Sequence, residues 1–356
     1  MSKLLHQVAK AARPYAFASG YAPVAVEFRP GESSLIRFGT GDAEVGACLR
    51  CPTTPCMMFS DSEVNSSSLP DFPADKSPQT CAAGAMSISL DIGVPQVDKD
   101  RCVGCGVCAS RCPTGAIGIR EDIGAFVVEQ HGSPAYQLTA GGDDEAFNST
   151  LHALASVERQ GSHATESDEL LKRSTIKMDE AAQVMGDQFP VHHVRNLLLA
   201  LGQGAAMRRK GNNHMRMDIL LGPPSVERGF VEVEFGQLAA LDAPRDVLDA
   251  TAVLHSRHGW NKNDTVALIV TDRLPNRRSG YWSVIADVRK VAGLQIGTLT
   301  TLAMHMAIWL RRELPEPAQL YVDKDSPSYR THVLEQIAAR KVALAPDALS
   351  TIEIAK

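Results

Sequence analysis

The sequence predicts a protein of two folded parts, a small α+β module rich in cysteine and a larger α/β domain. Three observations carry this prediction. All eight cysteines lie between Cys48 and Cys112, a short motif occurs twice in that region, and strands alternate with helices after residue 175. A chain of 356 residues is long enough for two domains with separate cores. We divide the chain into an N-terminal segment at 1–39, the cysteine module at 40–130, a connector at 131–174 and the second domain at 175–356.

The composition is that of a globular protein, with 44% hydrophobic and 22% charged residues. No stretch contains the roughly 18–20 uncharged apolar residues of a membrane helix, so we expect no membrane association. The N-terminus lacks the apolar core of an export signal and reads as an amphipathic helix, which favours a cytoplasmic location. The net charge of −5 does not indicate nucleic-acid binding, but Leu171–Arg216 holds eight Lys/Arg against three Asp/Glu. This stretch is either a phosphate-binding face or a solvated helix face.

The second group of cysteines has the strongest motif in the chain. It reads Cys102-x2-Cys105-x2-Cys108-x3-Cys112-Pro113. Clustered cysteines in a cytoplasmic protein favour metal ligation over disulfides, and three thiolates at this spacing suit one [4Fe–4S] cubane. Zinc is the alternative, but it prefers paired C-x2-C hooks.

The first group, Cys48-x2-Cys51-x4-Cys56 followed by Cys81, is related to the second by an internal repeat. The segment that begins at Cys81 (CAAGAMSI) matches the one that begins at Cys112 (CPTGAIGI). About 90 residues thus resemble the two-cluster bacterial ferredoxins. The resemblance implies two [4Fe–4S] clusters, one bound by Cys102, Cys105, Cys108 and Cys81, the other by Cys48, Cys51, Cys56 and Cys112.

The first group departs from the ferredoxin pattern in two ways. The spacing before Cys56 is x4 instead of x2, and Met57–Thr80 is a Ser/Pro/Asp-rich insertion where the family has three residues. The insertion either shields a cluster, docks a partner or has no role. The clusters themselves transfer electrons, sense redox state or stabilise the fold.

Periodicity predicts the elements of the rest of the chain. We expect strands at 125–128, 215–221, 229–235 and 265–271, and helices at 146–159, 176–186, 191–209, 244–257, 281–292, 298–313 and 328–341. His192 and His193 have no partner at ligand spacing and are interpreted as a helix start. No dinucleotide-binding or P-loop motif is present, so the sequence offers no electron partner for the clusters.

The second informative feature is a set of acids on neighbouring strands. Asp218 lies on one expected strand, and Glu232 and Glu234 lie two residues apart on the next, so both glutamates project from the same face. Three converging carboxylates repel one another unless a cation neutralises them, and Mg²⁺ prefers such oxygen ligands. The alternative is an amphipathic hairpin whose carboxylates face water.

Asp218, Glu232-x-Glu234 and the following helix and strand resemble the PD-(D/E)xK nuclease superfamily, in the E-x-E variant of some type II restriction endonucleases. The resemblance implies that Asp218 and Glu232 bind Mg²⁺ or Mn²⁺ and that Glu234 replaces the usual lysine, orienting water or assisting the metal. Glu180 is the nearest choice for an additional upstream acid. Four basic residues before the motif are candidates for phosphate contacts: Arg208, Arg209, Lys210 and Arg216.

Together these resemblances predict an α+β ferredoxin domain with two [4Fe–4S] clusters fused to an α/β restriction-endonuclease-like domain. The expected function is Mg²⁺-dependent DNA cleavage in restriction or defence by a homodimer, with the ferredoxin part as a structural, DNA-contacting or redox-sensing accessory. The alternatives are an electron-transfer protein whose second domain docks a redox enzyme, and an inactive DNA-binding module that responds to oxidation.

Overall fold

The computed structural model describes about three-fifths of the chain. These residues are 24–28, 54–88, 95–111, 117–120, 127–130, 136–140, 168–223, 226–236, 239–275, 279–309, 314–315 and 317–322. The chain forms two compact units. The first comprises Met1–Ser60 and Pro78–Thr165, and the second comprises Asp61–Ser77 and Glu166–Lys356.

The described residues of the first unit form three antiparallel strand pairs and one short helix. The pairs are β1 (Val24–Phe28) with β6 (Tyr136–Ala140), β2 (Met86–Ile88) with β3 (Pro95–Val97), and β4 (Ile117–Arg120) with β5 (Val127–Gln130). Helix α3 (Val107–Arg111) lies between the second and third pairs in sequence. Strand β2 begins five residues after Cys81, and β4 begins five residues after Cys112, so the repeat in the sequence is also a repeat of strands.

A mixed five-stranded sheet in the order β11-β10-β9-β8-β7 forms the centre of the second unit. The three strands β7 (Gly204–Met207), β8 (Ile219–Gly222) and β9 (Gly229–Glu234) are antiparallel neighbours. Strands β10 (Val266–Thr271) and β11 (Ile296–Thr300) continue parallel to β9. The described part of this unit also contains two short 3-10 turns, Lys262–Asp264 and Pro317–Leu320.

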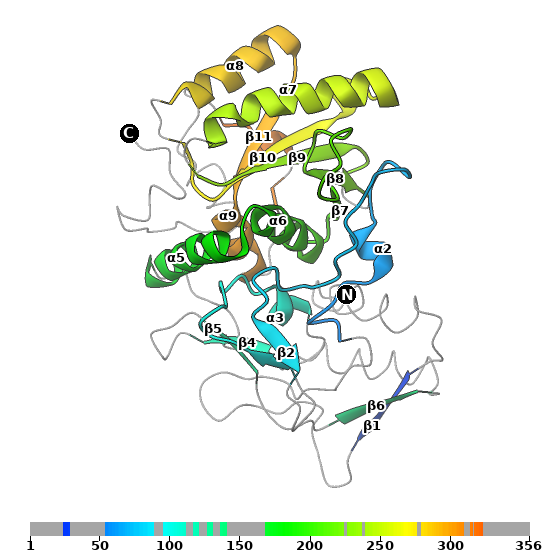
Figure 1. Ribbon diagram of the computed structural model, residues 1–356, viewed down its shortest axis with the longest axis vertical. Helices are drawn as coiled ribbons and strands as arrows, with labels where there is room; N and C mark the ends of the chain where they lie inside the picture. The colour runs from blue at the N-terminus through cyan, green and yellow to red at the C-terminus, as the bar shows by residue number, and fades with distance from the viewer. Residues whose placement is uncertain are drawn as a thin grey trace. The chain divides into compact units, whose positions relative to one another are not determined.

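Helices cover both faces of this sheet (Figure 1). Helices α7 (Ala239–His258) and α8 (Gly280–Ala292) contact each other, and α7 lies on β9 and β10. On the other face lie α6 (Gln188–Ala200) and α9 (Thr301–Trp309), with α5 (Asp168–Met185) packed against both. All of the side chains of β7 and β8 are buried, as are those of α9, which explains their uninterrupted apolar character.

Two predicted helices proved partly wrong. The helix expected at 191–209 ends at Ala200, and Gly202 has a left-handed φ of 83° that leads into strand β7. Residues 298–300 of the helix expected at 298–313 belong to β11, and α9 starts only at Thr301. In both cases pairing with a neighbouring strand overrides local helix preference.

The other predicted elements have mixed outcomes. Strands β9 and β10 and helices α7 and α8 are confirmed with shifted ends. Strand β8 starts at Ile219, so Asp218 lies directly before the strand and not within it. The predicted helices at 1–17, 146–159 and 328–341 lie outside the described residues. None of the described helices is long and apolar enough to cross a membrane.

The insertion between Cys56 and Cys81 belongs partly to the second unit, which the sequence did not indicate. Residues 61–77 pack with the five-stranded sheet, and their short helix α2 (Asp61–Val64) contacts β7. The predicted contiguous module at 40–130 therefore contains a segment that folds with the other unit.

Candidate functional site

Five of the eight cysteines are described, and their thiols gather in the first unit. Burial raises the pKa of the Cys105 thiol, and the nearby Cys81 and Cys102 raise it further. Burial likewise raises the pKa of Cys108 well above its ordinary value, with additional contributions from Cys105, Cys102, Cys81 and Cys56. The structure thus brings together the four cysteines predicted for one cluster and places Cys56 beside them, whereas Cys48, Cys51 and Cys112 lie outside the described residues.

Backbone amides point at the sulfur atoms. The N–H of Ala85 donates to Cys81 Sγ at 3.1 Å, and that of Gly104 donates to Cys102 Sγ at 3.4 Å. Gly104 and Gly106 have φ angles of 71° and 82°, which a side chain disfavours, so glycine allows the chain to turn tightly between the ligands. Such N–H···S bonds stabilise thiolate charge. Buried thiols with amide donors therefore fit an iron–sulfur cluster, whose iron neutralises the thiolates.

The acids of the second unit lie in one row across the sheet. Register pairs Ile219 with Val231 and Met207 with Ile219. One further step along both ladders places Asp218 opposite Glu232 on one side and opposite Arg208 on the other. The backbone bond from Arg208 N to Asp218 O, at 2.8 Å, continues the ladder beyond the strand end. The tertiary structure therefore aligns one cation and two carboxylates on neighbouring strands.

Glu232 is the least solvated acid of this row. Its side chain is only 3% exposed, and Oε1 has no hydrogen-bond partner. Burial raises the pKa of Glu232 well above its ordinary value, and three neighbouring carboxylates raise it further: Asp218, Asp246 and Glu234. A buried carboxylate oxygen without a partner is costly, and a proton or a cation relieves that cost. Burial and the neighbouring acids thus favour the protonated form of Glu232 when no cation is bound.

Glu234 and Asp246 complete the acidic environment. Burial raises the pKa of Glu234 to about 7, and Asp218, Asp246 and Asp242 contribute repulsion. Asp246 comes from α7, which covers β9, and burial raises its pKa too. Asp246 was not among the site residues predicted from the sequence. Its signal is the spacing of Asp242, Asp246 and Asp249, which puts three acids on one helix face.

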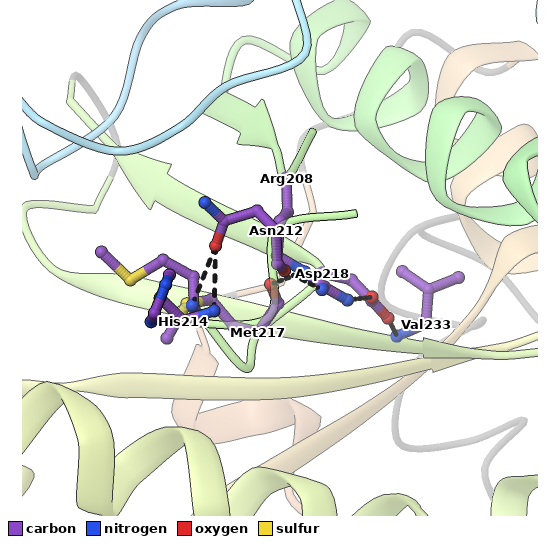
Figure 2. A network of polar contacts seen from close by, with 7 residues as sticks. Arg208, Asn212, His214, Met217, Asp218 and Val233 are labelled. Carbon is purple, nitrogen blue, oxygen red and sulfur yellow. Dashed lines mark hydrogen bonds and ion pairs between the residues drawn. The ribbon is translucent and has the colours of Figure 1, made fainter. Parts of the chain in front are cut away.

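Asp218 is held by two donors (Figure 2). Its Oδ2 accepts from the backbone N–H of Val233 at 3.0 Å, and Arg208 Nη2 donates to its Oδ1 at 3.3 Å. Arg208 also donates to the carbonyls of Met217, at 3.2 Å, and Asn212, at 2.6 Å. Burial raises the pKa of Asp218, and these donors oppose the shift. Arg208, predicted as a phosphate contact, is thus engaged with Asp218 and the turn before it.

The other predicted basic residues remain at the surface. Arg209 and Lys210 are exposed in the turn after β7, and Arg216 is exposed and forms an ion pair with Asp249 at 3.6 Å. Glu180, the suggested upstream acid, is exposed and pairs with Lys177 at 2.8 Å. Among the described residues, no three His, Cys, Asp or Glu side chains are arranged closely enough to hold a single metal ion.

A buried histidine pair is a polar feature that no sequence pattern predicts. His193 Nε2 and His305 Nε2 are 2.8 Å apart, and Ser174 Oγ lies 2.9 Å from His305 Nδ1. Burial lowers the pKa of His193 to about 3 and that of His305 well below its ordinary value, so both rings are neutral. His193 lies inside α6, 112 residues from its partner, and no local pattern connects the two.

Comparison with known proteins bears on the first unit. Residues 95–118 match the family of 4Fe–4S binding domains. An uncharacterized ferredoxin of Methanocaldococcus jannaschii is 33% identical over 76 residues, which are 21% of this chain and 35% of that protein. The match thus spans about a third of the relative's length. No solved structure matches this chain.

Proposed function

We propose that this chain, whose residues 95–118 match a 4Fe–4S binding domain, is an iron–sulfur-containing, Mg²⁺-dependent DNA endonuclease. The observation that carries the proposal is the buried, unpartnered Oε1 of Glu232 among Asp218, Glu234 and Asp246. A site of this kind gains most from a divalent cation, which neutralises several carboxylates at once. The cysteine module is then a structural, DNA-contacting or redox-sensing accessory.

The order of elements supports the proposal. Helix α7 lies between the acidic strand β9 and the next strand β10, as the resemblance to the PD-(D/E)xK superfamily requires. Asp218 directly precedes β8, and Glu232 and Glu234 lie in the second half of β9, the strand that pairs with β8. These features agree with the E-x-E branch of that superfamily, whose restriction enzymes suggest a role in genome defence.

Each site residue has a distinct task in the proposed reaction. Asp218 and Glu232 would hold Mg²⁺, which would lower the pKa of a bound water and stabilise negative charge on the phosphate. Glu234, with a pKa of about 7, is suited to accept the proton of the attacking water near neutral pH. The oxygen of the attacking water would bond to phosphorus as its proton passes to Glu234, the phosphorus–oxygen ester bond would break, and the leaving oxygen would take a proton from solvent. The exposed Arg209, Lys210 and Arg216 would contact the DNA phosphates.

The test is a cleavage assay with protein purified anaerobically and supplied with DNA and Mg²⁺ or Mn²⁺. Glu232→Gln keeps the shape of the side chain and removes its charge, so cleavage should fall at least about 100-fold. Glu227→Gln is the matched control. Glu227 is an exposed acid in the turn between β8 and β9, so this variant should retain full activity. Absence of metal-dependent cleavage by the wild type, or equal activity of both variants, would refute the proposal.

We also propose that the module holds two [4Fe–4S] clusters. Cys81, Cys102, Cys105 and Cys108 would bind one, and Cys48, Cys51, Cys56 and Cys112 the other. The protein should then contain ~8 iron and ~8 sulfide per chain. Cys56→Ala should reduce both to ~4, whereas a single-cluster protein would show ~4 before the change.

An electron-transfer protein is the second candidate, favoured by the similarity to an uncharacterized ferredoxin. In that case the second unit would dock a redox enzyme. Rapid reversible reduction of the clusters without any metal-dependent cleavage of DNA would support this candidate. A third outcome, DNA binding that depends on cluster oxidation and persists in Asp218→Ala, would identify an inactive DNA-binding module.

The proposal also includes partners and location. DNA is the expected substrate, and a homodimer is expected because two sites are needed to cut both strands. Sedimentation of the protein with and without DNA tests the dimer. We also propose that the protein is located in the cytoplasm and that a redox partner exchanges electrons with its clusters.

A further inference from the structure

The insertion that separates Cys56 from Cys81 begins as a paired stem in the first unit. Phe59 N donates to Pro78 O at 2.7 Å, Thr80 N donates to Met57 O at 2.9 Å, and Thr80 Oγ1 donates to Cys56 O at 2.6 Å. The stem thus starts directly at the two cysteines. Buried Arg111 supports it from α3 by donating to Pro55 O at 2.8 Å and Met58 O at 3.3 Å.

The remainder of the insertion, Asp61–Ser77, is called the head here, and it folds with the second unit. Asp75 N donates to Met207 O, and Arg209 N donates to Pro73 O, both at 2.8 Å. Ala74 pairs with Arg208 in an antiparallel bridge between these two bonds. The head therefore adds a short paired stretch to β7, the edge strand of the sheet.

Additional contacts fix the head along β7 and β8. Ser68 Oγ donates to Leu221 O at 2.7 Å, and the buried Arg195 donates from Nη2 to Ser77 O at 2.7 Å. A Cβ atom on Gly222 would lie 2.9 Å from the Ser67 backbone, so close approach of the head requires glycine there.

We propose that the head is a positioning element of the acidic site and links cluster binding at Cys56 and Cys81 to the placement of Asp218. The head holds the backbone at Arg208, and Arg208 holds Asp218 through its guanidinium and backbone N–H. The inference deepens the proposed function, because it names what controls the proposed hydrolytic site.

The physical reason lies in the covalent path. Iron ligation fixes the two ends of the stem, so the stem and the head at its tip have fewer conformations available. Loss of the clusters frees both cysteines and weakens the pairing that begins at Cys56. Edge pairing at Arg208 depends on the head, so the Arg208–Asp218 contact loosens in turn.

Hydrogen–deuterium exchange on the full-length protein tests this link without any cleavage assay. The amides of Asp75 and Arg209 report on the head, and the amide of Val233 reports on Asp218, its acceptor. Removal of iron by chelation should accelerate exchange at these three amides at least tenfold. The amides of Ile269 and Leu299, in β10 and β11, should change less than twofold. Unchanged head amides, or an equal rise throughout the sheet, would overturn the link.

Gly222→Ala provides a second test with the clusters in place. The new methyl group displaces the head, so Arg209 and Val233 should exchange at least tenfold faster while visible absorbance shows that iron is retained. Gly280→Ala is the matched control, because nothing lies within 4 Å of a Cβ atom at that position. An unaltered Val233 amide in Gly222→Ala would overturn the proposal. Hydrogen–deuterium exchange tests the link through the head and does not require DNA cleavage. The cleavage assay tests the proposed function, so the failure of one proposal can be distinguished from the failure of the other.

Discussion

The carboxylate of Asp218 accepts a hydrogen bond from the backbone N–H of Val233, the residue between Glu232 and Glu234. This bond, 3.0 Å long, ties the first acid of the motif to the strand that carries the other two. Because the bond is formed by the backbone of β9, the distance between the acids depends on strand pairing and not on flexible loops. Two predictions follow from this geometry, and two more concern buried groups elsewhere in the chain.

Asp218→Asn should weaken Mn²⁺ binding at least tenfold. The amide oxygen can still accept the Val233 N–H, but the charge that attracts a cation is lost. Titration of Mn²⁺ by electron paramagnetic resonance measures the affinity. Asp264→Asn, an exposed acid distant in sequence from the motif, serves as the control and should bind Mn²⁺ as the wild type does. Equal affinity of wild type and Asp218→Asn would exclude Asp218 as a ligand.

Glu234→Gln should alter the pH dependence of stability. Its pKa is raised to about 7, so the folded protein keeps a proton between pH 4.5 and 7 that the unfolded chain has lost. Wild-type stability therefore decreases as pH rises through this window, whereas glutamine does not titrate. At pH 8 without added metal, the variant should be more stable by about 1–2 kcal/mol, since partial exposure screens the repulsion.

Urea unfolding at pH 4 and pH 8 measures this effect. The two proteins should be equally stable at pH 4, where both side chains are neutral. Saturating Mg²⁺ at pH 8 should remove the advantage of the variant, because the cation relieves the repulsion in the wild type. A pH-independent difference would contradict the assignment, and Glu227→Gln should show no difference at either pH.

The histidine pair should destabilise the protein in acid. The unfolded chain binds protons at both rings below about pH 6.5, whereas the folded pKa of His193 is about 3 and that of His305 is also lowered. Stability contributed by the neutral pair is complete above pH 6.5 and is lost as pH falls toward 3. The unfolding free energy then changes by up to about 2.7 kcal/mol per pH unit, because two protons are involved.

A double variant, His193→Leu with His305→Leu, isolates this contribution. The unfolding free energy of the wild type minus that of the double variant should be constant above pH 6.5. Below pH 6.5 this difference should decrease as the pH falls. His214→Gln, at an exposed position, should leave the wild-type profile unchanged. A flat difference from pH 7 to pH 4 would show that the buried rings do not resist protonation.

Arg111→Met should accelerate loss of iron. Arg111 is 5% exposed, donates to the carbonyls of Pro55 and Met58, and stacks over the Phe59 ring at 4.0 Å. Methionine fills similar space but leaves the buried carbonyl of Pro55 and the partly buried carbonyl of Met58 without this donor. The rate of iron transfer to a chelator should rise about tenfold. Arg101→Met, at an exposed position near the same cysteines, should release iron at the wild-type rate.

Local patterns in the sequence indicated several features that the structure contains. The run at Cys102–Cys108 indicated a binding site for one metal cluster, because ligand spacing within a few residues is set by local geometry. Alternation at Glu232 and Glu234 indicated a strand, and β9 is that strand. Strand β11 escaped prediction because α9 follows it at once and is buried on every side, so no polar face marks the boundary.

The sequence by itself determined the chemistry available: thiols at cluster spacing, acids two apart on a strand, and basic residues before them. The tertiary structure alone decided which of these groups meet. Strand register placed Arg208 beside Asp218, and an insertion between two cysteines joined the sheet of the other unit. His193 met His305 in the same way. Local periodicity encodes which face of an element is buried, whereas pairing across long separations depends on how all the buried faces pack together.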